Sequence, residues 1–175
     1  MKSQIDLLPP EKKSGASNHR HSSNQKVGTP WNLITAIQGK FGPLSWDLAA
    51  SSENCKAGAG RFFDEAADSF KQNWHKLSGN LWLNPPFGCI TPWAEKCWKE
   101  CQQGATIFLL TPASVDAAWW TNFIHRKAVV YFLSPRIQFD GHDDPFPKPM
   151  ALSRFDPAFQ QTCEPGWYEP WRWRD

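Results

Sequence analysis

The segment NLWLNPPFGCITPWAEKCWKECQQGATIFLLTPASVDAAWWTNFIHRKAVVYFL, residues 80–133, decides the fold. It contains three short apolar runs with the length and residue types of buried strands, at 80–83, 106–110 and 128–133. Helix-compatible sequence separates these runs. Because the run at 106–110 is almost wholly apolar, we expect its sheet to be covered on both faces. The alternation of strand and helix predicts an α/β sandwich with a mainly parallel sheet flanked by helices.

The two helices expected within this segment have recognisable ends. Thr91-Pro92-Trp93 is typical of a helix start, and Gly104 of a helix end. Cys97 and Cys101 lie between them at helical spacing. Ser114 is expected to cap the second helix.

The sequence before residue 80 extends the same architecture. Thr29 is expected to cap a helix that has Pro30 in its first position and stops at Gly39. A strand is predicted at 44–48, and Arg61-Phe62-Phe63 suits a second short strand.

The remaining elements complete the domain. Residues 64–74 are helix-compatible, with apolar positions on one side. After a turn-rich loop at 140–149, a final strand at 151–155 is expected to close the sheet as a C-terminal antiparallel hairpin.

The chain of 175 residues suits one domain. We expect a disordered polar tail over residues 1–28, a globular domain over 29–160, and a C-terminal tail rich in aromatic residues and Arg over 161–175. The net charge of +2 does not by itself indicate a nucleic-acid-binding protein. No apolar run has a transmembrane length and the N-terminus lacks a signal-peptide core, which favours an intracellular, cytoplasmic protein. None of the five cysteines forms a CxxC pair, so free thiols are expected and no metal site.

Asn84-Pro85-Pro86-Phe87 is the strongest functional signal. It follows an apolar strand, and two prolines force the chain into a stiff turn with free carbonyls. Asn84 offers an amide oxygen, Pro85 a carbonyl and Phe87 a flat apolar face. Two acceptors beside an aromatic ring suit an exocyclic amine on a planar base, although a proline-rich turn that ends a strand is the structural alternative.

Asp47 comes at the end of the predicted strand at 44–48. In open α/β sheets ligands bind outside the carboxyl ends of the strands. We therefore expect Asp47 and Asn84 to share one crevice.

In this order the motifs resemble the phage-encoded DNA N6-adenine methyltransferases, the Dam-like phage group. The resemblance covers roughly residues 29–156. The matching residues are Thr29-Pro30-Trp31, Trp46-Asp47-Leu48-Ala49-Ala50, Asn54, Asp68, Leu83-Asn84-Pro85-Pro86-Phe87-Gly88, Leu110-Thr111-Pro112-Ala113, Trp119-Trp120 and Arg136-Ile137-Gln138-Phe139.

The resemblance implies transfer of a methyl group from S-adenosylmethionine to N6 of an adenine flipped out of double-stranded DNA. Asn84 and Pro85 would accept hydrogen bonds from the two N6 hydrogens, and Phe87 would stack on the base. Asp47 would hold the positive end of the donor. The other implied donor-binding residues are Thr29, Pro30, Trp31, Asn54 and Asp68; for Asn54 and Asp68 a purely solvated role is equally expected.

The resemblance also implies a small class I methyltransferase-like (Rossmann-like) fold of phage or prophage origin, working in a bacterial cytoplasm. No GxGxG loop follows Asp47, and only residues 48–83 separate it from Asn84. The cofactor half is therefore expected to be truncated. Cytosine-N4 methylation, methylation of a protein glutamine amide, and an inactive DNA-binding homologue remain alternatives. The DNA recognition sequence and the oligomeric state stay open.

Overall fold

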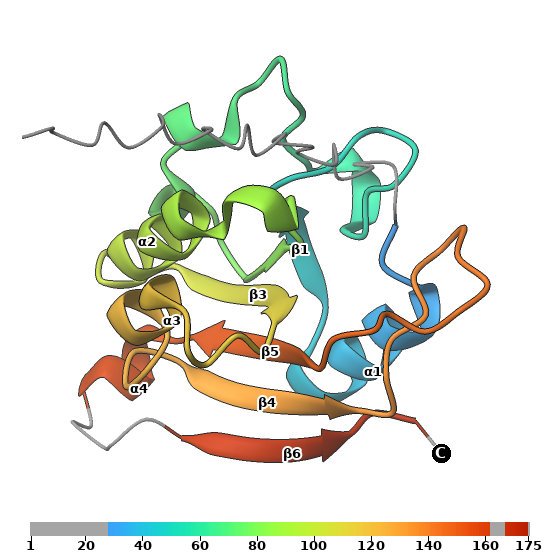
Figure 1. Ribbon diagram of the computed structural model, residues 1–175. Coiled ribbons are helices and arrows are strands. Elements are labelled where there is room, and N and C mark those ends of the chain that lie inside the picture. The colour runs from blue at the N-terminus through green and yellow to red at the C-terminus, as the bar shows by residue number, and fades with distance from the viewer. Residues whose placement is uncertain (1–27, 162–166, 175) are drawn as a thin grey trace, which may run out of the picture.

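The computed structural model describes residues 28–161 and 167–174, which include a six-stranded sheet with helices on both faces (Figure 1). The strand order is β1-β2-β3-β5-β4-β6. The strands are β1 Leu44–Asp47, β2 Asn80–Leu83, β3 Thr106–Pro112, β4 Val129–Ser134, β5 Met150–Phe155 and β6 Tyr168–Arg172. The helices are α1 Trp31–Phe41, α2 Ile90–Cys101, α3 Ala118–Phe123 and α4 Pro157–Gln161, with short 3-10 turns η1 Gly58–Gly60, η2 Ser69–Lys71, η3 Trp74–Lys76 and η4 Phe87–Cys89.

The sheet is mainly parallel, as predicted. Strand β2 pairs in parallel with both β1 and β3, and β4 pairs in parallel with β6. Strand β5 is antiparallel to both of its neighbours, β3 and β4. The expected antiparallel hairpin is therefore confirmed, and β5 lies between β3 and β4 rather than at the edge.

Side chains on the two faces of the sheet form two separate cores. In β2, Leu81 and Leu83 pack with α2 and α3, whereas Trp82 between them packs with α1. All three side chains are at most 1% exposed. This burial on both faces explains why the strands lack a polar alternation.

The ends of α1 differ from the prediction. Pro30 is the N-cap residue, the helix starts at Trp31, and no side chain caps it. The helix continues past Gly39 to Phe41, and the C-cap residue Gly42 follows with a φ of 91° that suits glycine. The hydroxyl of Thr29 is instead directed to Asn84.

Residues 61–74 also differ. Phe62 makes a single parallel bridge to Asp47 rather than a full strand. No α-helix forms over 64–74, because Asp68 has a left-handed backbone with a φ of 49°, which a right-handed helix does not allow. Asp64 accepts from the N–H of Ala67 at 2.8 Å, and Asp68 from that of Phe70 at 3.2 Å. Two 3-10 turns result.

The helices on either side of β3 are shifted from their expected starts. Helix α2 begins at Ile90, one residue before Thr91, and Gly104 lies beyond its end with a φ of 114°. Helix α3 begins only at Ala118, so Ser114 lies in the turn before it and does not cap it.

The C-terminal segment is part of the sheet. Residues Tyr168–Arg172 pair with β4, and Trp173 is 6% exposed with its Nε1 donating to the carbonyl of Pro135 at 2.8 Å. The sequence predicts a C-terminal tail in this region and does not predict the strand. The polar tail predicted over 1–28 lies outside the described residues except for Gly28. No helix in the described ranges is long and apolar enough to cross a bilayer.

Candidate active site

The parallel strands β1 and β2 end side by side, and the predicted site residues follow from this pairing. Asp47, the last residue of β1, is in register with Trp82 of β2. The N–H of Leu48 donates to the carbonyl of Trp82 at 2.8 Å and extends the pairing by one step. Asn84 is the first residue beyond β2. The expectation that Asp47 and Asn84 share one crevice is confirmed, because both line the same polar pocket.

The pocket gathers three segments of the chain. Its lining consists of Gly28, Thr29, Asp47, Ala49, Asn54, Lys56, Trp82 and Asn84. Its volume is about 40 Å³, which holds a few water molecules but not a nucleoside. A larger ligand would have to extend beyond this volume or displace the segments around it.

Asn84 presents an unpaired acceptor. Its Nδ2 donates to Oγ1 of Thr29 at 3.1 Å. Its Oδ1 is buried and has no hydrogen-bond partner among the described residues. A buried acceptor without a partner costs free energy, so a ligand N–H that reached it would gain a strong contact. The other buried side-chain N and O atoms without partners in the described ranges belong to Ser69, Thr111, Ser153 and Arg154, and none of these residues lines the pocket.

Asp47 is a buried carboxylate, 3% exposed. Its Oδ1 accepts from the N–H of Ala49 at 3.3 Å, and its Oδ2 from the N–H of Lys56 at 2.9 Å. Burial raises its pKa to about 6, although these two hydrogen bonds and the charge of Lys56 act in the opposite direction. Asp47 is therefore largely ionised at neutral pH, at a cost to the fold that a cationic ligand would offset.

Sequence reasoning missed Lys56. Its side chain is 6% exposed, with Nζ 3.4 Å from Oδ2 of Asp140 and 4.7 Å from the ring centroid of Trp31. The N–H of Asp140 also donates to the carbonyl of Gly28 at 2.9 Å. The pocket is thus closed by contacts between chain segments far apart in sequence.

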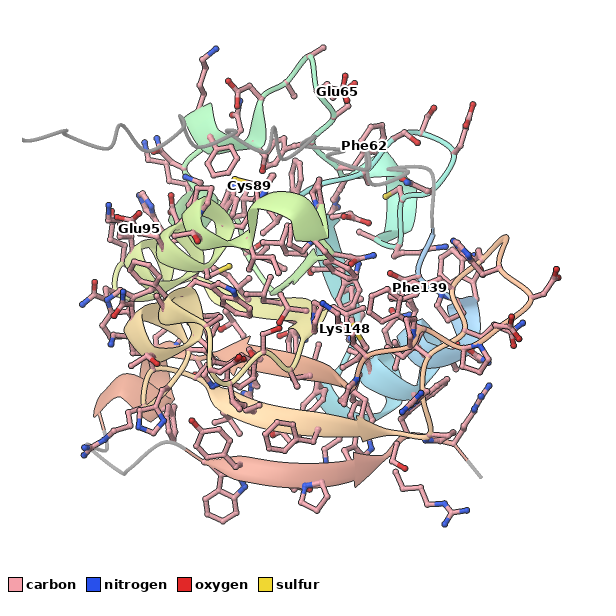
Figure 2. The ribbon with its side chains drawn as sticks, viewed as in Figure 1. Phe62, Glu65, Cys89, Glu95, Phe139 and Lys148 are labelled. Atoms are coloured by element: carbon pink, nitrogen blue, oxygen red, sulfur yellow. The ribbon has the colours of Figure 1, made fainter. Side chains whose placement is uncertain are left out.

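Phe87 belongs to a cluster of three aromatic rings. Its centroid lies 6.1 Å from that of Phe139 and 5.6 Å from that of Phe146, both edge to face, and the latter two are 5.6 Å apart. Phe139 is on the segment after β4, on the same side of the molecule as α1 (Figure 2). The ring of Phe87 is therefore held in place by residues from the loop between β4 and β5.

Comparison with known proteins identifies the family of the chain. The sequence pattern of the family described as DNA N-6-adenine-methyltransferase (Dam) matches residues 16–148, most of the chain. The chain belongs to this family. The DNA N-6-adenine-methyltransferase of Escherichia phage T1 is 27% identical over 119 residues, 66% of this chain and 48% of that relative. The Dam-family chain thus spans about half the length of the curated relative it matches. The resemblance identified from the motifs is confirmed.

The remaining candidate residues of the Dam-family chain differ in how close they lie to the pocket. Asn54 lines the pocket, with its Oδ1 accepting from the N–H of Ser51 at 2.7 Å. Trp31, 56% exposed, does not line the pocket, but its ring lies 4.7 Å from Nζ of Lys56, which does. Asp68 instead caps η2, pairs with Lys71 at 3.0 Å and does not line the pocket. Its role in donor binding stays a prediction.

The described ranges contain no group of three or more His, Cys, Asp or Glu residues placed to hold a metal ion. Four of the cysteines, at 55, 89, 97 and 101, are free thiols, and Cys163 lies outside the described residues.

Proposed function

We propose that this Dam-family protein transfers a methyl group from S-adenosylmethionine to N6 of an adenine flipped out of double-stranded DNA. The observation that carries the proposal is the buried Oδ1 of Asn84 at the carboxyl end of β2, which has no hydrogen-bond partner within residues 28–161 and 167–174. Family membership supports the same activity. The reaction would take place in the cytoplasm of a bacterial host, and the similarity to a phage protein supports a phage or prophage origin.

The target amine matches the acceptors of the Asn84–Phe87 turn. An exocyclic amine has two N–H donors, and the Asn84 amide oxygen and the Pro85 carbonyl would each accept one. Both contacts draw the nitrogen lone pair out of conjugation with the ring. Pro85 and Pro86 restrict the backbone torsions of the turn, so the acceptors are preorganised. The base must leave the duplex to reach them.

Phe87 would stack on the flipped base. Its edge-to-face contacts with Phe139 and Phe146 restrict the orientation of the ring, which lowers the entropy lost on stacking. Much of catalysis by such a site consists of holding the amine in line with the methyl carbon.

The residues present fit a cationic donor. When bound, S-adenosylmethionine supplies an electrophilic methyl group on a sulfonium. The buried carboxylate of Asp47 would stabilise its positive end, and the pocket residues Thr29 and Asn54 would border it. Pro30, Trp31 and Asp68, which do not line the pocket, are further candidates for contacts with the donor. In the described ranges β1 is the edge strand and the chain from 48 to 79 adds no further strand beside it. This supports a truncated cofactor half on a class I-like fold.

The deciding experiment incubates the protein with S-adenosylmethionine labelled in the methyl group and unmethylated double-stranded DNA, followed by digestion and identification of the labelled nucleoside. We expect N6-methyldeoxyadenosine. Label in N4-methyldeoxycytidine would show that the protein methylates the exocyclic amine of cytosine and not that of adenine. Label in a protein glutamine would indicate a protein methyltransferase. Donor binding without any transfer would indicate an inactive homologue.

A further inference from the structure

The pocket contains two buried groups of opposite charge that do not pair with each other. Asp47 and Lys56 are 3% and 6% exposed, and both line the pocket. The carboxylate of Asp47 is bound by backbone N–H groups, one of them that of Lys56 itself. The Nζ of Lys56 instead pairs with Asp140, whose side chain is half exposed. Two separated, desolvated charges of opposite sign are complementary to a zwitterion.

We infer that Lys56 binds the carboxylate of the amino-acid end of the methyl donor, with Asp47 stabilising the ammonium beside it. This inference rests on the proposed function and names a binding residue that neither the motifs nor the family comparison supplies. A free α-amino acid group carries one ammonium and one carboxylate, and each needs an oppositely charged partner when it leaves water.

The present partner of Lys56 can be exchanged. The 3.4 Å distance to Asp140 is long for a charge-assisted hydrogen bond, and Asp140 can regain water when released because it is half exposed. The ring of Trp31 at 4.7 Å stabilises the ammonium in either state. Lys56 would therefore leave Asp140 for the ligand carboxylate, and this exchange would also loosen the contact that narrows the pocket.

The first test uses the unmodified protein and calorimetry without any turnover. The probes are S-adenosylhomocysteine and its decarboxylated analogue, which keeps the ammonium and lacks only the carboxylate. We expect the analogue to bind about 30-fold more weakly, the size of a lost charge-assisted hydrogen bond. Equal affinities would overturn the inference while leaving the proposed function intact. No binding of either probe would overturn both.

The second test assigns the carboxylate contact to Lys56. Lys56→Met keeps most of the side-chain volume and should bring the two probes to within about threefold of each other, whereas Lys56→Arg should keep the preference. Asp140→Ala breaks the same ion pair from the other side and should keep it too. Asp140→Ala could instead remove the preference for the carboxylate-bearing probe as fully as Lys56→Met does. In that case the preference would depend on the Lys56–Asp140 ion pair and not on a contact between Lys56 and the ligand carboxylate. Thermal unfolding of each variant confirms that it folds.

Discussion

Thr29 Oγ1 accepts a hydrogen bond from Asn84 Nδ2 at 3.1 Å, and this contact turns the buried amide oxygen of Asn84 away from Thr29, where no other group in the described part of the chain donates to it. The two residues are 55 positions apart in the chain. A side chain expected to cap a helix thus orients the principal candidate catalytic group.

Removing the acceptor itself should have the largest effect. We expect Asn84→Ala to lower kcat by on the order of 10²-fold or more, as the loss of one preorganised polar group does. Affinity for S-adenosylhomocysteine should change little. Asn122→Ala, at an exposed position of α3, is the matched control and should keep wild-type turnover. Near-normal kcat in Asn84→Ala would remove Asn84 from the mechanism.

Removing the orienting contact should have a smaller effect. Thr29→Val keeps the shape of a side chain that is 2% exposed but leaves Asn84 Nδ2 without its acceptor. We expect kcat to fall by about tenfold, the value of one neutral hydrogen bond that is realised in the transition state. Thr35→Val removes an exposed hydroxyl that donates to the carbonyl of Trp31 within α1 and should be neutral. Unchanged kcat in Thr29→Val would show that Asn84 is oriented by other contacts.

The ionisation of Asp47 should oppose folding. Its pKa is raised to about 6 from the usual 3.8, so the folded state binds the proton more tightly than the unfolded state. The stabilising effect is complete below the unfolded pKa and is lost as the pH rises through the folded pKa. Relative to Asp47→Asn, the wild-type free energy of unfolding should therefore fall by about 2 kcal/mol between pH 4 and pH 7, measured by urea denaturation. A constant difference between the two proteins would contradict a raised pKa.

The same group should give donor binding a pH dependence of the opposite kind. A cationic donor favours ionised Asp47, so its affinity should weaken as the pH falls below about 6. Calorimetric titration with S-adenosylmethionine at a series of pH values would measure this. In Asp47→Asn the affinity should be lower and this dependence absent; a persistent dependence would assign it to another group.

Glu100 of α2 forms a buried ionic cluster with Lys96 and His75. Because none of these residues lines the pocket, the cluster should contribute to stability alone. Although burial opposes ionisation, hydrogen bonds from Lys96 and His75 hold the pKa of Glu100 below its usual value of 4.5. Glu100→Gln should cost about 3 kcal/mol at pH 7, because it leaves Lys96 without its anion. That stability should be lost in wild type as the pH falls through the lowered pKa.

The control for this change lies on the same helix. Glu95 pairs with Lys99 at 2.6 Å on the outer side of α2 (Figure 2), where both side chains are well exposed. Glu95→Gln should cost at most about 0.5 kcal/mol. Equal losses in the two variants would show that burial does not strengthen the Glu100 contacts.

Much of the fold could be predicted because the core strands are nearly all apolar and end at strong turn signals. The run at 106–110 and the proline turn after Leu83 are examples. The segment from 64 to 74 could not, since its residue types suit a helix, and the interruption comes from the left-handed backbone of Asp68 and its side-chain contact with the N–H of Phe70. Strand β6 was missed because it is short and has Pro170 at its centre, which argues against a strand unless it lies at an edge.

The candidate site shows the same division. Asp47 and Asn84 could be placed together because both end parallel strands, which is a property of the sheet. Lys56 could not, because its position depends on how an irregular loop folds back onto Asp47. No periodic pattern marks a buried lysine in such a loop.

The position of β5 between β3 and β4 constrains the order in which the chain can assemble. Strands β1, β2 and β3 neighbour one another in sequence and can pair as soon as they leave the ribosome. Strand β4 is synthesised next, yet it joins the rest of the sheet only through β5, which is made after it, and β6, which pairs with β4, is made last. The aromatic loop that holds Phe87 joins β4 to β5. The base-binding side of the site is therefore expected to be completed late, after the Asn84 turn has formed.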